Sequence, residues 1–370
     1  MNIEKIEQIL KDQKQPKFRL GQIKKAVYQD GISNFSEIST IPKELRSVLE
    51  KEKILSFEVE KVLVSKDGNS AKALVKLNDG NKIETVLISP KENIWSVCIS
   101  CQVGCPMNCV FCATGQTGFK RNLTHEEIVD QVLFWKQYLK KIQDTKSKKQ
   151  TNFKSQISNL KLSNVVYMGM GEPFLNWEEV LESLKILSDP KGMSFGSRSI
   201  SISTVGISGG IEKLTEDFPQ VNLAVSLHFS QDENRNEFMP ANKNLNLEKL
   251  KIELEKYFEV SNRKVFLEYI MFSGLNDSEK DAKNLLEYIK SFKKPQLLHV
   301  NLIRYNSTNS EQETVNKNQN TEIKNKFVSS SSEQAIKFRN YLLENKINCT
   351  IRRSLGTDIE GACGQLAGKK

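Results

Sequence analysis

The sequence predicts an α/β fold: a mostly parallel sheet, open or closed into a barrel, preceded by a small helical domain and an antiparallel strand extension. Three observations predict it. Apolar side chains recur at helical spacing near the N-terminus, then alternate with polar ones, and then form strand-like runs separated by helix-length segments. We divide the chain into a helical domain, a strand connector, a core and a C-terminal cysteine segment, at residues 1–50, 51–93, 94–350 and 351–370.

The helical domain and the strand connector differ in the period of their apolar residues. Residues 57–88 alternate apolar and polar side chains and contain turn sequences at 67–69 and 78–81. This pattern predicts a meander of antiparallel strands that leads into a cysteine-rich loop. In the helical domain, the apolar residues at helical spacing are Ile3, Ile6, Leu10, Leu20, Ile23 and Val27.

The core begins with a helix start at Thr124, where Glu127 completes a capping box. Strand-like runs then alternate with helix-length segments, which is typical of βα units around a parallel sheet. The runs are Val165–Met168, Ser199–Ser203, Leu223–Leu227, Val265–Ile270 and Leu298–Ile303. Residues 140–161 and 307–333 have few apolar side chains, and we expect them to be surface insertions.

Charge and composition restrict the class of protein. The 370 residues include 54 Lys and Arg against 45 Asp and Glu, giving a net charge of +9. This excess favours a polyanionic partner, although a lysine-rich composition gives the same charge without one. No apolar run reaches the roughly 18 to 20 residues of a membrane helix, and residues 1–14 lack the apolar stretch of a signal peptide. We therefore expect a cytoplasmic protein without a membrane partner.

Cysteines mark the candidate site. Five of the seven fall within residues 98–112, which in a cytoplasmic chain predicts metal or redox chemistry rather than a disulfide framework. Cys105, Cys109 and Cys112 form a Cys-x3-Cys-x2-Cys run, whose thiolates are expected to converge on a soft-metal centre. Zinc is the alternative, but tetrahedral zinc needs a fourth ligand, for which Cys98 or Cys101 is available. The spacing favours an iron-sulfur cluster.

This run resembles the signature of the radical S-adenosylmethionine (SAM) enzymes. The resemblance implies a partial (βα)6 barrel in which Cys105, Cys109 and Cys112 bind a 4Fe-4S cluster whose open iron is chelated by SAM. The segment Met168–Pro173 follows a strand and resembles the SAM-binding motif of these enzymes, since its glycines let a ligand approach the backbone. The SAM contacts implied by the resemblance are Gly171, Glu172, Ser203, Ser226, Leu227, His228 and Asn306.

Two further cysteines, Cys98 and Cys363, narrow the resemblance to the RlmN and Cfr family of radical SAM RNA methyltransferases. The segments Val97–Cys105 and Asp358–Gly368 resemble motifs of that family. The implied mechanism uses two SAM molecules: Cys363 accepts a methyl group from the first, and a radical from the second activates this group for addition to adenine. Cys98 then attacks the Cys363 sulfur, which releases the RNA and leaves a transient disulfide.

The chemistry explains why a thiolate is needed. Carbons 2 and 8 of adenine are too poorly nucleophilic to take a methyl group from SAM directly, whereas a thiolate does so readily. The resemblance implies that Glu84 accepts the ring proton; without the resemblance, a solvated strand carboxylate is an equal interpretation. Cys101 and Cys349 fill positions that the family does not need, and we interpret them as structural.

The subfamily motifs favour methylation of carbon 2. Met168–Pro173, Phe111–Leu123 and Gln365–Gly368 resemble RlmN, whereas His299–Asn306 resembles Cfr, whose reaction is the alternative methylation of carbon 8. The implied substrates are adenosine 2503 of 23S rRNA and adenosine 37 of tRNA. An electron donor of flavodoxin or ferredoxin type is a further implied partner, and we expect a monomer.

Basic side chains are candidate RNA contacts, although each taken singly is equally a solvated surface residue. A non-catalytic RNA-binding metal protein is an alternative function, but it leaves Cys98, Cys363 and the Gly171-Glu172 motif unexplained. A radical SAM enzyme acting on a peptide or a small molecule is a second alternative, but it does not need the two extra cysteines. The candidate RNA contacts are Lys14, Lys17, Arg19, Lys24, Lys25, Lys120 and Arg121.

Overall fold

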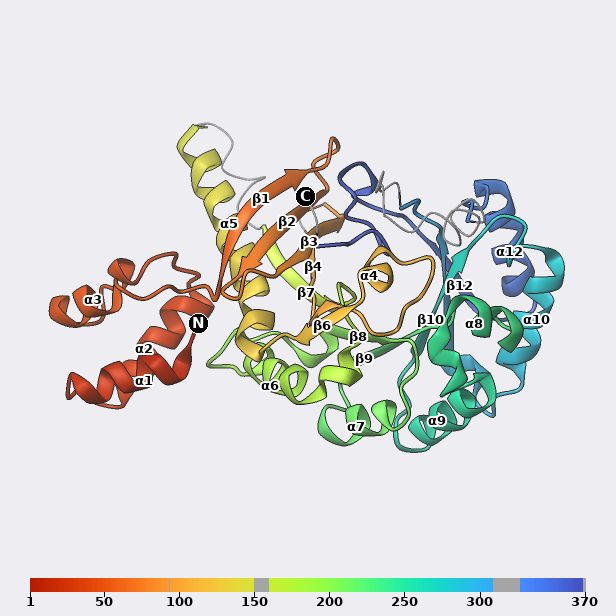
Figure 1. Ribbon diagram of the computed structural model, residues 1–370, viewed down its shortest axis with the longest axis horizontal. Coiled ribbons are helices and arrows are strands. Elements are labelled where there is room, and N and C mark those ends of the chain that lie inside the picture. Colours follow the sequence, from red (N-terminus) through yellow and green to blue (C-terminus); the bar gives the residue numbers. More distant parts are fainter. Residues whose placement is uncertain (93, 150–159, 309–326, 369–370) are drawn as a thin grey trace.

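The protein is organised around a large mixed sheet. The structure, a computed structural model, describes residues 1–92, 94–149, 160–308 and 327–368. Ten strands form one sheet in the order β1-β2-β3-β4-β7-β8-β9-β10-β11-β12, and β5 pairs with β6 in a second sheet. Figure 1 shows the N-terminal helices at one end of the long axis and α12 at the other, with the large sheet between them.

The N-terminal domain is helical, as the sequence predicts. It contains α1 (Ile3–Asp12), α2 (Phe18–Lys24) and α3 (Lys43–Leu49), with helical turns at Lys25–Gln29 and Phe35–Glu37. The Asn2 side chain caps α1 by accepting a hydrogen bond from the Lys5 N–H. Four of the six apolar residues predicted to form the buried face are fully buried: Ile6, Leu10, Ile23 and Val27.

The strand connector forms the predicted antiparallel meander. Three strands pair in order along the chain, and β4 then pairs antiparallel with β3 and parallel with β7. β4 thus joins the meander to the parallel part of the sheet and ends at Cys98. The strands are β1 (Phe57–Val64), β2 (Ser70–Leu77), β3 (Lys82–Lys91) and β4 (Ile94–Cys98).

The parallel part of the sheet confirms the predicted α/β fold. All neighbours from β4 through β12 pair in parallel, so the carboxyl ends of these strands meet at one edge. β1 and β12 are the two outer strands, which makes this an open, partial barrel. β12 is additional to the five predicted strands. The strands are β7 (Lys161–Tyr167), β8 (Ile200–Thr204), β9 (Asn222–Ser226), β10 (Val265–Met271), β11 (Leu298–Arg304) and β12 (Asn348–Arg352).

Helices follow the parallel strands and lie around the outside of the sheet (Figure 1). The predicted capping box starts α5: the Glu127 N–H donates to Thr124 Oγ1 at 3.3 Å, and the Thr124 N–H donates to the Glu127 carboxylate at 3.1 Å. Among the described residues, no helix combines the length and the apolar character needed to cross a membrane. The helices are α5 (His125–Lys149), α6 (Trp177–Ser188), α7 (Gly210–Asp217), α8 (Asp232–Phe238), α9 (Leu247–Val260), α10 (Glu279–Lys290) and α12 (Ser332–Glu344).

The two predicted insertions are shorter than expected. Residues 140–149 continue α5, because a lysine-rich stretch propagates a helix that is already capped and packed. The second insertion ends earlier, since Ser329 pairs with Phe272 in a β-bridge and α12 begins at Ser332. The rest of both insertions, residues 150–159 and 309–326, lies outside the described part of the chain.

Candidate active site

A cavity of about 480 Å³ lies where the carboxyl ends of the parallel strands meet the C-terminal segment. This edge is where α/β folds bind their ligands, and the volume suits a small molecule. The sequence-predicted residues that line the cavity are Cys98, Cys105, Cys109, Cys112, Gly171, Glu172, Ser203, Ser226, His228, Asn306 and Cys363. Two predicted residues, Glu84 and Leu227, do not line it.

A glycine and a short helix shape the loop that carries the three cysteines. Gly104 has a φ of +76°, and a Cβ at this position would lie 1.8 Å from the Gly118 carbonyl oxygen, so only glycine fits. A Cβ at Gly115 would lie 2.8 Å from the Cys109 carbonyl oxygen, so the helix packs directly on the loop. The surrounding elements are β5 (Gln102–Gly104), α4 (Ala113–Gln116) and β6 (Phe119–Asn122).

The donor set of this loop fits a metal cluster. Cys105, Cys109 and Cys112 are free thiols that line the same cavity. Burial raises the pKa of Cys105 to about 12 and also raises the pKa of Cys109, as do the neighbouring thiolates, so a bound cation would favour ionisation of these two thiols. In the described part of the chain, no three His, Cys, Asp or Glu side chains converge on a single-ion site. Three thiolates on one loop are the donor set that iron-sulfur clusters take.

Aromatic side chains cover the inner side of the cysteine loop. Phe111 is 4% exposed, and its ring lies 5.3 Å from that of His228 and 5.4 Å from that of Phe272. Phe229 stacks on Phe272 at 5.8 Å, with an angle of 9° between the rings. These rings keep water from that side of the thiols, and such exclusion tunes a metal centre.

Glu172 places a buried carboxylate in the cavity. Gly171 has a φ of +107°, and a Cβ there would lie 2.6 Å from the Gln102 side chain, so the turn after β7 requires glycine. The Glu172 side chain accepts hydrogen bonds from the N–H groups of Val205 at 2.9 Å and Phe174 at 3.2 Å. Burial nevertheless raises the pKa of Glu172 to about 7. A cationic amine in the cavity would find its counter-ion here.

His228 and two serines line the cavity at the ends of β8 and β9. The Ser203 and Ser226 hydroxyl oxygens lie 3.3 Å apart. His228 adopts a φ of +57°, and its Nδ1 accepts a hydrogen bond from the Ile270 N–H at 3.3 Å. Burial lowers the pKa of His228 to about 3, so the ring is neutral at physiological pH and serves as a lining and hydrogen-bonding group.

Arg235 holds these strand ends in place through hydrogen bonds to their backbone, a role that the sequence did not suggest. Its fully buried guanidinium donates to the carbonyl oxygens of Leu227 and of Val205, the latter at 3.2 Å, and to the Asn242 side chain at 2.7 Å. The Leu227 side chain itself packs in the core rather than in the cavity. Leu227 is thus held through its backbone, and β8 and β9 are tied together at the edge of the site.

Cys98 and Cys363 are free thiols that line the same cavity. Cys98 is half-buried at the end of β4, whereas Cys363 is exposed to the cavity from the C-terminal segment. Burial and, to a smaller extent, the nearby Cys363 raise the pKa of Cys98 to about 12. Each cysteine is therefore within electrostatic reach of the other, in a cavity that the three cysteines of the loop also line.

An ion pair that the sequence did not reveal lies beside these two thiols. Arg352 Nη1 lies 3.1 Å from Glu268 Oε2, both residues line the cavity, and Asn301 donates to Glu268 Oε1 at 2.8 Å. The Arg352 charge lowers the pKa values of Cys98 and Cys363, against the larger effect of desolvation, which raises them. A cation beside a thiol favours the reactive thiolate. The signal in the sequence was Glu268, a lone carboxylate within an apolar strand.

Glu84 lies outside the cavity, with its carboxylate already occupied. The side chain is fully buried, with Oε1 2.8 Å from Lys72 Nζ. Oε2 accepts hydrogen bonds from the N–H groups of Ala367 at 2.6 Å and Gly368 at 3.0 Å. The solvated strand carboxylate considered from sequence is therefore wrong, because the C-terminal segment covers Glu84. Its assignment as a proton acceptor stays a prediction.

Comparisons with known proteins agree with this geometry. Residues 99–286 match the radical SAM superfamily. A Cfr ribosomal RNA methyltransferase of Bacillus velezensis is 37% identical over 98% of this chain and 95% of its own length. A probable dual-specificity RNA methyltransferase RlmN of Syntrophomonas wolfei is 38% identical over 99% and 95%. The chain belongs to the RlmN and Cfr family of radical SAM methyltransferases.

A solved structure supports the assignment to the radical SAM methyltransferases. A radical SAM methyltransferase from Sphaerobacter thermophilus superposes with a TM-score of 0.84 at 32% identity, covering 100% of this chain and 98% of its own. The chain therefore has the fold of a radical SAM methyltransferase. The cavity lies at the carboxyl ends of the barrel strands, where this architecture places its ligands.

The raised pKa of Glu172 predicts that SAM binding depends on pH. Because its pKa is about 7 in the free protein, the carboxyl group is mostly protonated below pH 7 and ionised above it. The cationic amine of SAM favours the carboxylate, so we expect affinity to increase as the pH rises through about 7, and binding at pH 6 to release a proton. Calorimetry in buffers of different ionisation enthalpy measures this release. Glu172→Gln should abolish it; an unchanged release in that variant would assign the proton to another group.

Proposed function

We propose that this protein methylates carbon 2 of adenosine 2503 in 23S rRNA and of adenosine 37 in tRNA, through a methyl group carried on Cys363. The observation that supports this most strongly is that Cys363 and Cys98 line the same cavity as the three cysteines of the loop. A radical SAM enzyme without the second pair of cysteines has no methyl carrier of this kind. The pairing therefore favours an RNA methyltransferase over the other reactions of the superfamily.

The residues that line the cavity have different roles in the proposed reaction. Cys105, Cys109 and Cys112 would hold a 4Fe-4S cluster, which when reduced supplies the electron that cleaves SAM. Glu172 binds the SAM amine, and the buried strand ends hold the rest of the molecule in place. The Cys363 thiolate takes the methyl group from a first SAM, forming a carbon-sulfur bond as the bond from the SAM sulfonium breaks and S-adenosylhomocysteine leaves.

Release of the product is the proposed task of Cys98. After the methyl carbon has joined the adenine, the base is tethered to the Cys363 sulfur. Once the ring proton has been lost, the Cys98 thiolate attacks this sulfur, a sulfur-sulfur bond forms, and the bond from sulfur to the methylene carbon breaks with its electron pair passing into the adenine ring. A proton then adds to that carbon and completes the methyl group. An external dithiol or its equivalent must then reduce the disulfide.

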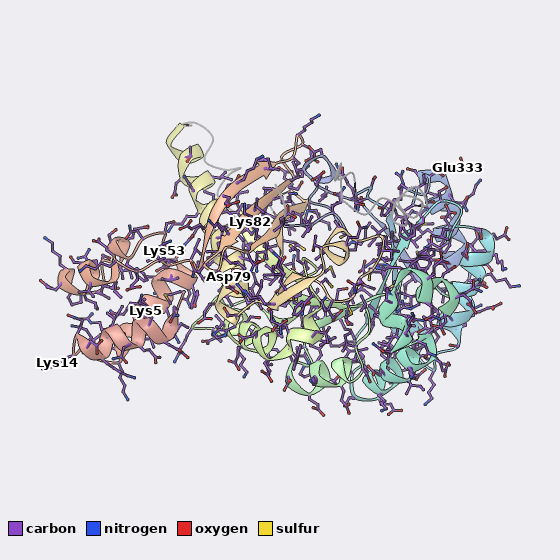
Figure 2. The ribbon with its side chains drawn as sticks, viewed as in Figure 1. Lys5, Lys14, Lys53, Asp79, Lys82 and Glu333 are labelled. Carbon is purple, nitrogen blue, oxygen red and sulfur yellow. The ribbon has the colours of Figure 1, made fainter. Side chains whose placement is uncertain are left out.

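The N-terminal helices offer a basic surface for RNA. Lys14, Lys17 and Lys25 are exposed there, and Figure 2 shows Lys5 and Lys14 at the end of the molecule opposite Glu333. Exposed lysines suit phosphate contacts around a structured RNA. Three of the predicted RNA contacts have partners within the protein. Arg121 pairs with Glu127 at 2.7 Å and with Asp79 at 2.5 Å. Arg19 donates to the Thr40 carbonyl oxygen, and Lys120 donates to the Asn81 side chain at 3.1 Å.

Methylation of carbon 8 is the second candidate. The segment His299–Asn306 resembles Cfr, and named relatives of both kinds match the chain at almost equal identity. We favour carbon 2 because Phe111–Leu123 and Gln365–Gly368 resemble RlmN, and the structure has both segments at the cavity: Phe111 and Leu366 line it.

The product identifies the reaction. Reconstituted enzyme is incubated anaerobically with SAM, a reductant and unmodified 23S rRNA or tRNA, and the nucleosides are analysed by mass spectrometry against standards. The proposal expects 2-methyladenosine. 8-Methyladenosine would establish the second candidate, and no methylated adenosine from either RNA would contradict both.

A further inference from the structure

One buried ion pair contacts the C-terminal segment on both sides of Cys363. Lys72 Nζ lies 2.8 Å from Glu84 Oε1, and the two side chains are 3% and 1% exposed. Lys72 also donates to the Glu360 carbonyl oxygen at 3.1 Å. Glu84 Oε2 accepts from the Ala367 N–H at 2.6 Å and from the Gly368 N–H at 3.0 Å. These contacts lie three residues before Cys363 and four and five residues after it.

The Lys72–Glu84 ion pair and the C-terminal segment stabilise one another. Two charges buried this deeply are unfavourable unless each makes further hydrogen bonds, and here the backbone of the C-terminal segment supplies them. The segment in turn has left-handed backbone at both contact points, with φ of +52° at Glu360 and +65° at Gly368. A Cβ at Gly368 would lie 2.7 Å from the Lys82 carbonyl oxygen, so the close approach to β3 requires glycine.

Between these two points, the segment touches the other parts of the site. The Cys363 carbonyl oxygen accepts from the Asn306 side chain at 3.2 Å, and the Gly364 carbonyl oxygen accepts from the Ala113 N–H at 2.8 Å. Thr114 Oγ1 donates to the Leu366 carbonyl oxygen at 2.6 Å. The backbone around Cys363 is thus bonded to the helix that follows the cysteine loop, while its side chain stays open to the cavity.

We propose that Lys72 and Glu84 form a clamp that positions Cys363 over the cavity by holding both ends of residues 360–368. Lys72 is then a positioning residue for the methyl carrier: it touches neither SAM nor the adenine. The functional consequence rests on the proposed role of Cys363, whereas the clamp itself does not. Removal of the clamp should free the segment without altering the residues that line the cavity.

Hydrogen exchange tests the clamp directly. In Lys72→Met, we expect the amides of Ala367 and Gly368 to exchange at least about tenfold faster than in the wild type, because the charge-assisted bonds that hold them weaken. Lys76→Met is the matched control, since Lys76 lies on the same strand, β2, but is exposed. In Lys76→Met, the two amides should exchange at the wild-type rate. Mass spectrometry of the peptide that contains residues 360–368 measures the exchange rate in both variants.

The double variant Lys72→Met/Glu84→Met keeps the test decisive if the single variant fails to fold. It leaves no unpaired buried charge, and apolar replacement of a buried ion pair is often tolerated. It still removes both anchors, so fast exchange of the two amides is expected again. Exchange within about twofold of the wild type in the folded variants would overturn the clamp.

A second readout separates the clamp from the proposed function. After exposure to SAM alone, the fraction of Cys363 that carries a methyl group is measured in the wild type, Lys72→Met and Lys76→Met. A methylated wild type with at least about tenfold less methyl on Lys72→Met supports positioning, provided that iron content is equal. An equal methyl fraction despite faster exchange would overturn the positioning role. An unmethylated wild type would contradict the function proposed for Cys363 and leave the exchange result to decide the clamp.

Discussion

Cys363→Ala is expected to lower RNA methylation by at least about a thousandfold while leaving iron and SAM binding intact. The loss is this large because an alanine side chain has no group that can accept the methyl group, and the target carbon of adenine does not react with SAM directly. Binding should survive, since Cys363 is exposed to the cavity and makes its hydrogen bond through the backbone. Methyl transfer from labelled SAM to RNA measures activity, and iron analysis measures the centre.

Cys349→Ala is the matched control. Cys349 is a buried thiol on β12 that does not line the cavity, so its loss removes a sulfur from the same part of the fold without touching the chemistry. Its activity should stay within a few fold of the wild type, at about the wild-type iron content. Substantial RNA methylation by Cys363→Ala would show that another residue carries the methyl group.

Cys109→Ala is expected to reduce bound iron from about four atoms per chain towards zero, together with the brown colour of the protein. Three protein thiolates are the minimum for a cluster with one open iron, and Cys109 is one of the three that line the cavity. Iron and sulfide analysis after anaerobic reconstitution gives the number of iron and sulfide atoms per chain, and the absorption spectrum gives the type of metal centre. RNA methylation should disappear with the iron.

The variant Cys101→Ala tests whether Cys101 is a ligand of the cluster or only lies near it in the sequence. Cys101 lies four residues before Cys105, but it is 2% exposed, packs in the core and does not line the cavity. This variant should keep its iron. Iron loss on Cys101→Ala with iron retained on Cys109→Ala would reverse the assignment, and stoichiometric zinc in place of iron in the wild type would contradict the cluster itself.

The fold was predictable because local patterns and the final packing agree. The alternation over residues 57–88 predicted antiparallel strands, and the apolar runs from Val165 to Ile303 became parallel strands whose apolar side chains are mostly buried. β12 was missed because Asn348–Arg352 is short and mostly polar, so it forms a strand only by pairing with β11. The length of α5 was missed because a polar stretch extends a helix as readily as it forms a loop.

The site was predictable where residues close in sequence act together. The three cysteines of the loop and Gly171-Glu172 are such groups, and all of them line the cavity. Lys72, Arg235 and Arg352 were not identified, because nothing local distinguishes them from surface residues. Lys72 contacts Glu360, a residue 288 positions away, and such a contact exists only once the sheet has formed.

The most direct test of the account follows the methyl group itself. Reconstituted enzyme is given SAM with a deuterated methyl group, and the Cys363 peptide is analysed by mass spectrometry before and after addition of RNA and a reductant. The account predicts that the label appears first on Cys363, then leaves it and appears on carbon 2 of adenosine as the RNA is methylated. Labelled adenosine formed by enzyme whose Cys363 never carries the label would contradict it.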